Sequence, residues 1–459
     1  MGARPFGPGA SDCPHNRAQD RSPCGSHIVW ASAGFHPTPT FLMRLLHTSD
    51  WHLGQHFMGK SRQAEHQALI DWLLQQAQAQ AVDAVVLAGD IFDTGTPPSH
   101  ARELYSQLVV RLREAGVGLL LLGGNHDSVA MLGENQALLA CLGTHLVAQP
   151  AAQPADQVLV LAQRDGSPGC IVCAVPFIRP RDVLQSQAGQ SAQDKQQALQ
   201  QAIQAHYAAV YQAALARQAE LQSSLGRRLP LIATGHLTTL GSSLSESVRE
   251  IYVGSLEAYP CDAFPPVDYV ALGHIHRPQR VGGHEHIRYC GSPLPLSFDE
   301  AGQDKEVLLI DLGEAGLQQV TPLAVPRFQG LQAVRGTLDE LAQAMPALAA
   351  QATAACPLWL EVTVSQDDYL PDLPARVQQM TEGLPLEVLR VRRDRGTATA
   401  QLAALARETL DELSPQEVFE RRLQQEDLPP ELAQALAERY RGVVHALQQG
   451  SAEAEGAAA

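Results

Sequence analysis

Short apolar runs alternate with helical patterns through the first two thirds of this 459-residue chain. The apolar runs are too short for helices and end at Gly or Asp, so they predict buried strands. These strands are expected at residues 44–49, 84–88, 117–122, 231–234 and 269–272. Helical segments are expected at residues 61–80, 99–115 and 183–225. The alternation predicts a layered α/β fold around a largely buried sheet.

A boundary is predicted near residues 321–328, because the motifs that could carry chemistry end before it. Beyond this point, strand patterns at 358–364 and 386–390 flank a helical pattern at 375–382. Two strands around one helix predict a small α+β domain.

Residues 402–448 have the pattern of two further helices. Ser414, Pro415 and Glu417 resemble a capping box at the start of the first one. Apolar side chains at helical spacing give the second helix one apolar face, formed by Leu432, Leu436, Tyr440, Val443, Val444 and Leu447. This face either closes a core or binds a partner.

Both ends of the chain have compositions typical of disorder. Residues 1–42 are rich in Pro, Gly and polar side chains, and residues 451–459 read SAEAEGAAA. The first segment lacks the apolar centre of a signal peptide, and Met43 directly precedes the first predicted strand. We therefore expect residues 1–42 to be an extension or a mis-assigned start. No apolar run has the roughly 18 residues that span a bilayer, so no membrane association is expected.

The charge balance limits the ways in which this chain could bind nucleic acid. It has 33 Lys and Arg residues against 49 Asp and Glu residues, a net charge of −16. Such a chain is not expected to bind nucleic acid through a basic surface alone. Metal ions or a partner subunit would have to supply positive charge.

The eight cysteines are too scattered for a disulfide scaffold, which favours a reducing, cytoplasmic location. Cys170 and Cys173 form a CxxC, but they lie in the apolar run GCIVCAVPF. No second CxxC accompanies them. We therefore interpret them as small core residues of a buried strand rather than a zinc or redox site.

Five short polar motifs each follow an apolar strand pattern. They contain Asp50 and His52, Asp90, Asn125 with His126 and Asp127, His236, and His274 with His276. In open α/β sheets, ligands bind beyond the carboxyl ends of the strands, so segments far apart in sequence can meet there. Each motif alone is weak, but the five together predict one site.

The residue types indicate a metal centre. Carboxylate, amide oxygen and imidazole suit divalent Mn, Fe or Zn, and the absence of Cys argues against structural zinc. Without His126 and Asp127, the motifs offer seven donors, which are too many for one ion and suit two ions that share a carboxylate. Such a pair can clamp a phosphate and activate water for its hydrolysis.

The order DxH, GD, GNHD, GH, GHxH resembles the signature of the calcineurin-like metallophosphoesterases. The segments HTSDWHLG, GDIFDTGTPPSHARELY, GNHDS and LGHIHRPQ are similar to those of the nuclease subunits of bacterial SbcCD-type complexes. The resemblance runs from Met43 to about Leu447. It implies a four-layer β-sandwich flanked by helices at 43–325, an α+β cap at 326–400 and partner-docking helices at 401–450.

The resemblance also implies roles for the site residues and the identity of the metal, manganese. One ion would be held by Asp50, His52, Asp90 and His276, and the other by Asp90, Asn125, His236 and His274. His126 would act beside the scissile phosphate, and Asp127 would orient it through a hydrogen bond. The implied reaction is hydrolysis of DNA phosphodiester bonds, as a 3′–5′ exonuclease on duplexes and an endonuclease on single strands.

The implied partners are DNA and an SbcC-type ATPase, whose coiled-coil base the helices at 401–450 would bind. A homodimer of this chain with two ATPase subunits is the expected assembly, acting in DNA end processing, recombination and repair. Two alternatives stay open: a phosphatase or cyclic-nucleotide phosphodiesterase of small molecules, and a scaffold without activity. A small-molecule enzyme would have little need for the cap and docking helices.

Overall fold

The computed structural model describes residues 42–184, 191–240, 242–243, 258–365 and 372–394, together with residues 436, 439 and 440. The predictions for residues 1–41 and 451–459 lie outside the described residues, as do those for 401–450 apart from the three isolated positions. Among the described helices, none is long and apolar enough to cross a membrane.

The first six-stranded sheet contains the three earliest predicted strands. Its strand order is β14-β13-β1-β4-β5-β6. The bounds are β1 Met43–Thr48, β4 Ala84–Leu87, β5 Gly118–Leu122, β6 Thr144–Val147, β13 Glu306–Gly313 and β14 Gly316–Ala324. Strands β1, β4, β5 and β6 run parallel, whereas β13 pairs antiparallel with both β1 and β14. The carboxyl ends of β1, β4 and β5 therefore lie along one edge.

The second six-stranded sheet has the order β11-β12-β10-β9-β8-β7. The bounds are β7 Val158–Ala162, β8 Pro168–Cys173, β9 Leu231–His236, β10 Tyr269–Gly273, β11 Gln279–Val281 and β12 His284–Tyr289. Strands β8, β9, β10 and β12 are parallel, and antiparallel strands lie at both margins. The carboxyl ends of β9 and β10 again lie side by side.

The two sheets pack face to face because both sides of the strands are apolar. Successive side chains of a strand point to opposite faces. Leu45 of β1 packs between the sheets, while the next residue, Leu46, packs under the helices outside. Ile232 of β9 likewise faces the first sheet, and Leu231 faces outward. Continuous apolar runs are needed for this arrangement, which explains why the sequence shows no strict polar alternation.

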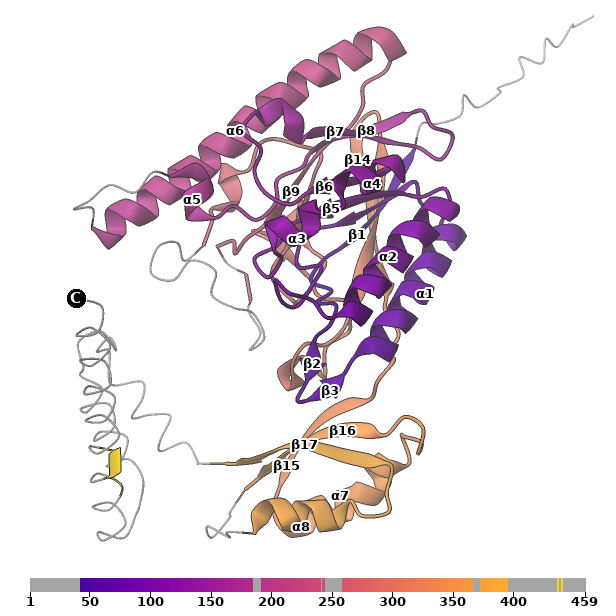
Figure 1. The fold of residues 1–459 in the computed structure, drawn as a ribbon, viewed down its shortest axis with the longest axis vertical. Helices are drawn as coiled ribbons and strands as arrows, with labels where there is room; N and C mark the ends of the chain where they lie inside the picture. The colour runs from indigo at the N-terminus through magenta and orange to yellow at the C-terminus, as the bar shows by residue number, and fades with distance from the viewer. Residues whose placement is uncertain are drawn as a thin grey trace, which may run out of the picture. The chain divides into compact units, whose positions relative to one another are not determined.

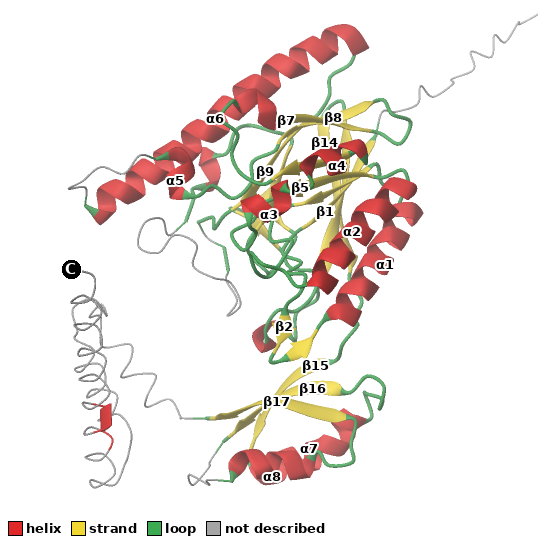
Figure 2. Cartoon of the chain, in the orientation of Figure 1, coloured by secondary structure: helices red, strands yellow, loops and turns green. Residues whose placement is uncertain are grey.

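Helices cover the outer faces of the sandwich. Helices α1 (Gln63–Ala79) and α2 (Ser99–Glu114) pack on the first sheet, and α6 (Ala192–Leu225) packs on the second (Figures 1 and 2). The predicted four-layer α/β architecture is therefore confirmed. The shorter elements are β2 His56–Phe57, β3 Lys60–Ser61, α3 Val129–Gly133, α4 Gln136–Cys141 and α5 Pro180–Val183.

A separate three-stranded parallel sheet follows the sandwich in sequence. Its order is β15-β16-β17, with bounds Leu331–Gly336, Leu358–Val364 and Leu386–Arg393. Helices α7 (Leu338–Ala349) and α8 (Leu373–Met380) share its apolar core. The sequence predicted β16, α8 and β17 but not β15 and α7. Strand β15 is only partly buried and α7 contains Pro346, so both have weak sequence patterns.

Cys170 and Cys173 are core residues, as expected. Both are fully buried in β8, but Cys170 packs between the sheets and Cys173 packs toward α6. Residues three apart in a strand point to opposite faces, so these thiols cannot converge on one ion. Burial also raises the pKa of the Cys173 thiol to about 12.

His47 joins the two sheets near the edge where the polar motifs lie. Its Nδ1 is 2.9 Å from the Tyr269 hydroxyl and its Nε2 is 3.2 Å from the Leu272 carbonyl oxygen. His47 belongs to β1 and its partners to β10, so the imidazole fixes the spacing of the strands that precede two of the motifs. Burial lowers the pKa of His47 to about 3, despite the opposing hydrogen bond to Leu272.

His47 should make the stability of the fold depend on pH. Between about pH 6.5 and pH 3 the unfolded chain binds a proton at His47 that the folded chain does not, so stability falls as the pH falls. From pH 7 to pH 5 this contribution is about 2 kcal/mol. The His47→Gln variant has no such group, and its free energy of unfolding in urea should fall less over this range. Parallel pH curves for the two proteins would contradict the assignment.

Candidate dinuclear metal centre

The predicted site residues come together at the carboxyl ends of parallel strands from both sheets. Asp50 and His52 follow β1, Asp90 follows β4, and Asn125, His126 and Asp127 follow β5. His236 ends β9, and His274 and His276 follow β10. The sequence could only suggest that these five segments meet. In the fold they do lie together.

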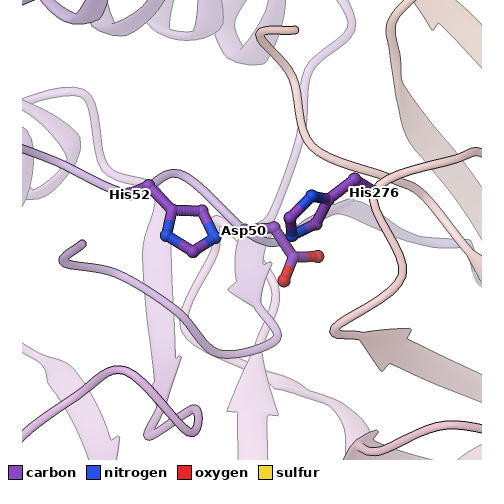
Figure 3. Close-up of side chains that lie close together, drawn as sticks. All are labelled: Asp50, His52 and His276. Atoms are coloured by element: carbon purple, nitrogen blue, oxygen red, sulfur yellow. The ribbon is translucent and has the colours of Figure 1, made fainter. Parts of the chain in front are cut away.

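The candidate ligands form two buried groups. Asp50, His52 and His276 offer ligand atoms that all lie within 4.8 Å of one another, and Figure 3 shows these three side chains gathered together. Asp90, His236 and His274 form the second such group. Each group holds one carboxylate and two imidazoles, a donor set that suits a divalent metal ion.

Asp90 links the two groups. Its Oδ2 atom is 3.3 Å from His236 Nε2 in the second group and 3.7 Å from His52 Nε2 in the first. Asn125 adds its amide oxygen to the second group, 2.9 Å from His236 Nε2 and 3.2 Å from His274 Nδ1. This placement gives a carboxylate the central position that a bridging ligand needs.

The loops that carry these residues have a strained backbone. Asp50, His52, Asp90 and His274 have φ values of 55°, 48°, 49° and 94°, in a region that residues other than glycine rarely adopt. Each costs of order 1–2 kcal/mol, and such strain persists only where surrounding contacts impose it. Here the amides of Asp50, Trp51 and His52 donate to the carbonyl oxygens of Gly89 and Asp90, at 2.9–3.1 Å.

The protonation state of His274 fits metal binding. Burial, followed by the neighbouring His236, lowers the pKa of His274 well below its ordinary value, so its imidazole is neutral. Its Nε2 atom is buried and has no hydrogen-bond partner among the described residues. A buried nitrogen lone pair without a partner is costly in a protein interior, and a metal ion would satisfy it. The residues present therefore fit the two ions.

Asp90 and His236 lie close enough to stabilise charge on each other. Burial opposes charge on both groups, but their mutual attraction outweighs it. The pKa of His236 is raised to about 9 and that of Asp90 is lowered well below its ordinary value. His236 Nδ1 is 2.9 Å from the Ala88 carbonyl oxygen, which fixes the ring so that Nε2 faces Asp90 and Asn125.

His126 lies beside the two groups and is fixed by the preceding loop. Its amide donates to Asp90 Oδ1 at 2.9 Å, and its Nδ1 is 2.7 Å from the Asp93 carbonyl oxygen. Because a carbonyl only accepts, Nδ1 carries a proton and Nε2 faces the site, 4.0 Å from Asp90 Oδ2. The Asp93 carboxylate also lies 3.2 Å from His52 Nδ1, so this residue contacts two of the site imidazoles.

Asp127 joins the loops that follow β4 and β5. Its carboxylate accepts hydrogen bonds from the amides of Ile91, Phe92 and Gly124 at 2.9–3.1 Å. Burial and the Asp90 charge raise its pKa to about 6. The atom that contacts His126 Nδ1 is the Asp93 carbonyl oxygen. Orientation of His126 by a hydrogen bond with Asp127 stays a prediction.

Sequence reasoning missed two buried residues beside the first group. Glu300 Oε1 lies 3.4 Å from His276 Nδ1, and Lys305 pairs with the same carboxylate at 2.6 Å. They lie more than twenty residues beyond the last motif, and one glutamate among exposed acidic neighbours gives no sequence signal. The packing of β13 beside β1 helps to bring this segment to the site.

Comparison with known proteins identifies two family models that match this chain. A family model described as calcineurin-like phosphoesterase matches residues 43–278, and a model described as type 5 capsule protein repressor C-terminal domain matches residues 327–427. A solved dimetal phosphatase from Danio rerio aligns distantly, with 11% identity and a TM-score of 0.33 over 62% of this chain and 99% of that one. The fold and the buried donor set define a calcineurin-like metallophosphoesterase.

Whole-chain relatives narrow the class further. The SbcD subunit of the nuclease SbcCD from Escherichia coli K12 is 48% identical over 88% of this chain and 98% of its own length. The proteins of the same name in Rhodobacter capsulatus and Bacillus subtilis are 34% and 31% identical, over 82% and 65% of this chain and 93% and 76% of their own. The chain belongs to this family of nucleases and is a metal-dependent phosphodiester hydrolase. The small-molecule alternative is not favoured.

Gly124 should be indispensable for metal binding. A Cβ at this position would lie 2.1 Å from Asp90 Oδ1 and 2.2 Å from the Asp90 amide nitrogen, and the backbone atom cannot swing aside. We expect Gly124→Ala to displace Asp90 and to lower the bound divalent metal, measured by elemental analysis after dialysis, at least tenfold. Gly133→Ala is the control, because a Cβ there meets nothing within 4 Å. Equal metal content in both variants would contradict the central position of Asp90.

Proposed function

We propose that this chain hydrolyses DNA phosphodiester bonds with two manganese ions, as a 3′–5′ exonuclease on duplexes and an endonuclease on single strands. Asp90 supports the proposal most directly, because it lies between two buried groups that each offer one carboxylate and two imidazoles. One ion would be held by Asp50, His52, Asp90 and His276, and the other by Asp90, Asn125, His236 and His274. Oxygen and imidazole donors suit divalent Mn, Fe or Zn, and manganese is proposed because the resemblance implies it.

When bound, two divalent ions lower the pKa of water and offset the negative charge of a phosphodiester. The chain itself contributes a buried cradle in which an oxygen atom lies within 3.4 Å of Nδ1 in each candidate imidazole. In the proposed reaction His126 approaches the scissile phosphate from the edge of the site. Because its Nδ1 proton is held by the Asp93 carbonyl, His126 can donate from Nε2 only as an imidazolium. It would then protonate the leaving oxygen or stabilise charge on the phosphate.

The acidic composition of the chain supports binding of DNA together with a partner protein. A net charge of −16 disfavours unaided binding to a polyanion, so a second protein would supply part of the phosphate-binding surface. The relatives are named as the SbcD component of SbcCD, which supports an SbcC-type ATPase as that partner. We further propose a cytoplasmic heterotetramer with two copies of this chain, and domains at 43–325, 326–400 and 401–450. The last of these would bind the coiled-coil base of the ATPase.

His126→Ala should separate catalysis from metal binding. The variant lacks the proton donor but keeps all seven candidate ligands, so it should retain two manganese ions and lose about 10²- to 10⁴-fold in rate. Cleavage of end-labelled duplex DNA with added manganese measures the rate, and His284→Ala, an exposed histidine of β12, is the control. Undiminished cleavage by His126→Ala would refute its role. Hydrolysis of a small phosphodiester by a wild type that leaves DNA intact would favour the small-molecule alternative.

The helical face predicted at 432–447 should determine binding of the ATPase. Leu436→Glu places a charge on that face, and we expect at least tenfold weaker co-purification with the SbcC-type ATPase. Hydrolysis of a small phosphodiester should be unchanged, because the metal centre is untouched. Gln434→Glu, off the predicted face, carries the same charge and serves as the control. Equal retention of both variants by the ATPase would argue against this docking segment.

A further inference from the structure

A buried ion pair lies directly behind the first group of candidate ligands. Glu300 follows the β12 strand in a short helical turn (Phe298–Glu300), and Lys305 precedes β13. Their side chains are 0% and 3% exposed, and their charged atoms are 2.6 Å apart. An ion pair removed from water is costly unless its geometry and hydrogen bonds are complete, so its presence requires an explanation.

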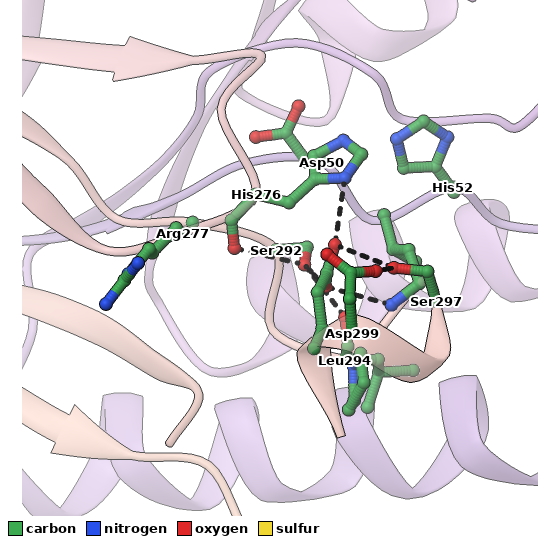
Figure 4. A network of polar contacts seen from close by, with 12 residues as sticks. Asp50, His52, His276, Arg277, Ser292, Leu294, Ser297 and Asp299 are labelled. Atoms are coloured by element: carbon green, nitrogen blue, oxygen red, sulfur yellow. Dashed lines mark hydrogen bonds and ion pairs between the residues drawn. The ribbon is translucent and has the colours of Figure 1, made fainter. Parts of the chain in front are cut away.

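The carboxylate of Glu300 is fixed through one oxygen and presents the other to His276. Oε2 accepts hydrogen bonds from Lys305 Nζ at 2.6 Å and from the Leu296 amide at 3.0 Å. Oε1 lies 3.4 Å from His276 Nδ1. Figure 4 shows this network on the side of His276 away from Asp50.

Lys305 also holds the backbone of the same histidine. Its Nζ donates to the His276 carbonyl oxygen at 2.9 Å and to Ser292 Oγ at 3.0 Å. The pair therefore holds both the ring and the main chain of His276. With a carboxylate at Nδ1, the ring carries its proton there and presents the lone pair of Nε2 on the opposite side, toward Asp50 and His52.

The second group of candidate ligands is supported differently. His236 Nδ1 contacts the neutral Ala88 carbonyl, and His274 Nδ1 contacts the Asn125 amide oxygen. In the first group, His276 and His52 contact the carboxylates of Glu300 and Asp93, and only Glu300 is fully buried. A carboxylate raises the basicity of an imidazole more than a neutral acceptor does, so loss of Glu300 affects one group and spares the other.

We propose that Glu300, held by Lys305 and the Leu296 amide, is a positioning residue that orients His276 and sets the metal affinity of the first group, independently of the second. The proposal rests on the assignment of Asp50, His52, Asp90 and His276 to one ion.

The test is manganese binding by the full chain, followed by electron paramagnetic resonance. The double variant Glu300→Gln/Lys305→Met removes both charges together, so no buried charge is left unpaired. We expect its affinity at one position to fall about 10- to 100-fold, so that at limiting manganese it binds one ion where the wild type binds two. The spectrum should change from that of a coupled pair to that of a single ion. Asp299→Asn, the exposed neighbour in the same turn, should match the wild type.

A second variant guards against loss of folding. Glu300→Asp keeps the charge that faces Lys305 but is one methylene shorter, so its carboxylate cannot maintain both contacts. It should lose affinity at the same position, with the unfolding temperature of the metal-free protein close to that of the wild type. Two manganese ions bound with wild-type affinity in either variant would overturn the proposal.

The same experiment distinguishes this proposal from the proposed nuclease activity. A wild type that binds two ions and leaves DNA intact would refute the activity, while the difference between wild type and Glu300 variants would still support the positioning role. A wild type that binds no divalent ion would overturn both. Restoration of DNA cleavage in the double variant at high manganese would support a defect in metal affinity rather than in chemistry.

Discussion

The buried carboxylate of Asp90 is the constraint on which the rest of the site depends. It lies at the end of a central strand, between two sheets, and is 1% exposed. A carboxylate in such a place needs positive or hydrogen-bonding partners from every side. His236 and His52 approach it from the two ligand groups, and the His126 amide donates to it. The main-chain carbonyl of Asp90 meanwhile accepts from the loop after β1, so one residue ties three segments together.

The strained backbone at the site follows from the same constraint. Side chains from five chain segments must reach a small volume around Asp90. Asp50, His52, Asp90 and His274 therefore adopt positive φ values, and Gly124 packs against Asp90 with no room for a side chain. The sandwich bears this cost because large apolar clusters on both sides of each sheet stabilise the strands that lead into the site. The layered fold thus supplies the rigidity that preorganised chemistry requires.

Polar groups around the site are arranged in successive shells. The candidate ligands face one another, and behind them lie carbonyls and carboxylates that determine which nitrogen of each imidazole is available. An oxygen atom of Asp93, Ala88 or Glu300 contacts Nδ1 of His52, His236 or His276, respectively, and leaves Nε2 available. Further from the ligands, His47 joins the two sheets through Tyr269 and Leu272. Leu272 lies two residues before His274 in the sequence. Packing, ring orientation and candidate chemistry are therefore connected through short chains of contacts.

Local sequence patterns were enough to predict the fold class and the list of candidate ligands. Apolar runs of strand length and polar motifs directly after them need no knowledge of distant residues. The ligand roles could be expected only through resemblance, and they stay predictions. How the ligands group, that the Asp93 carbonyl meets His126 at Nδ1, and that Glu300 and Lys305 lie behind His276 became visible only in the folded chain. The reason is physical: a contact across sheets depends on packing and register, and a single Glu or Lys carries no local pattern that reveals it.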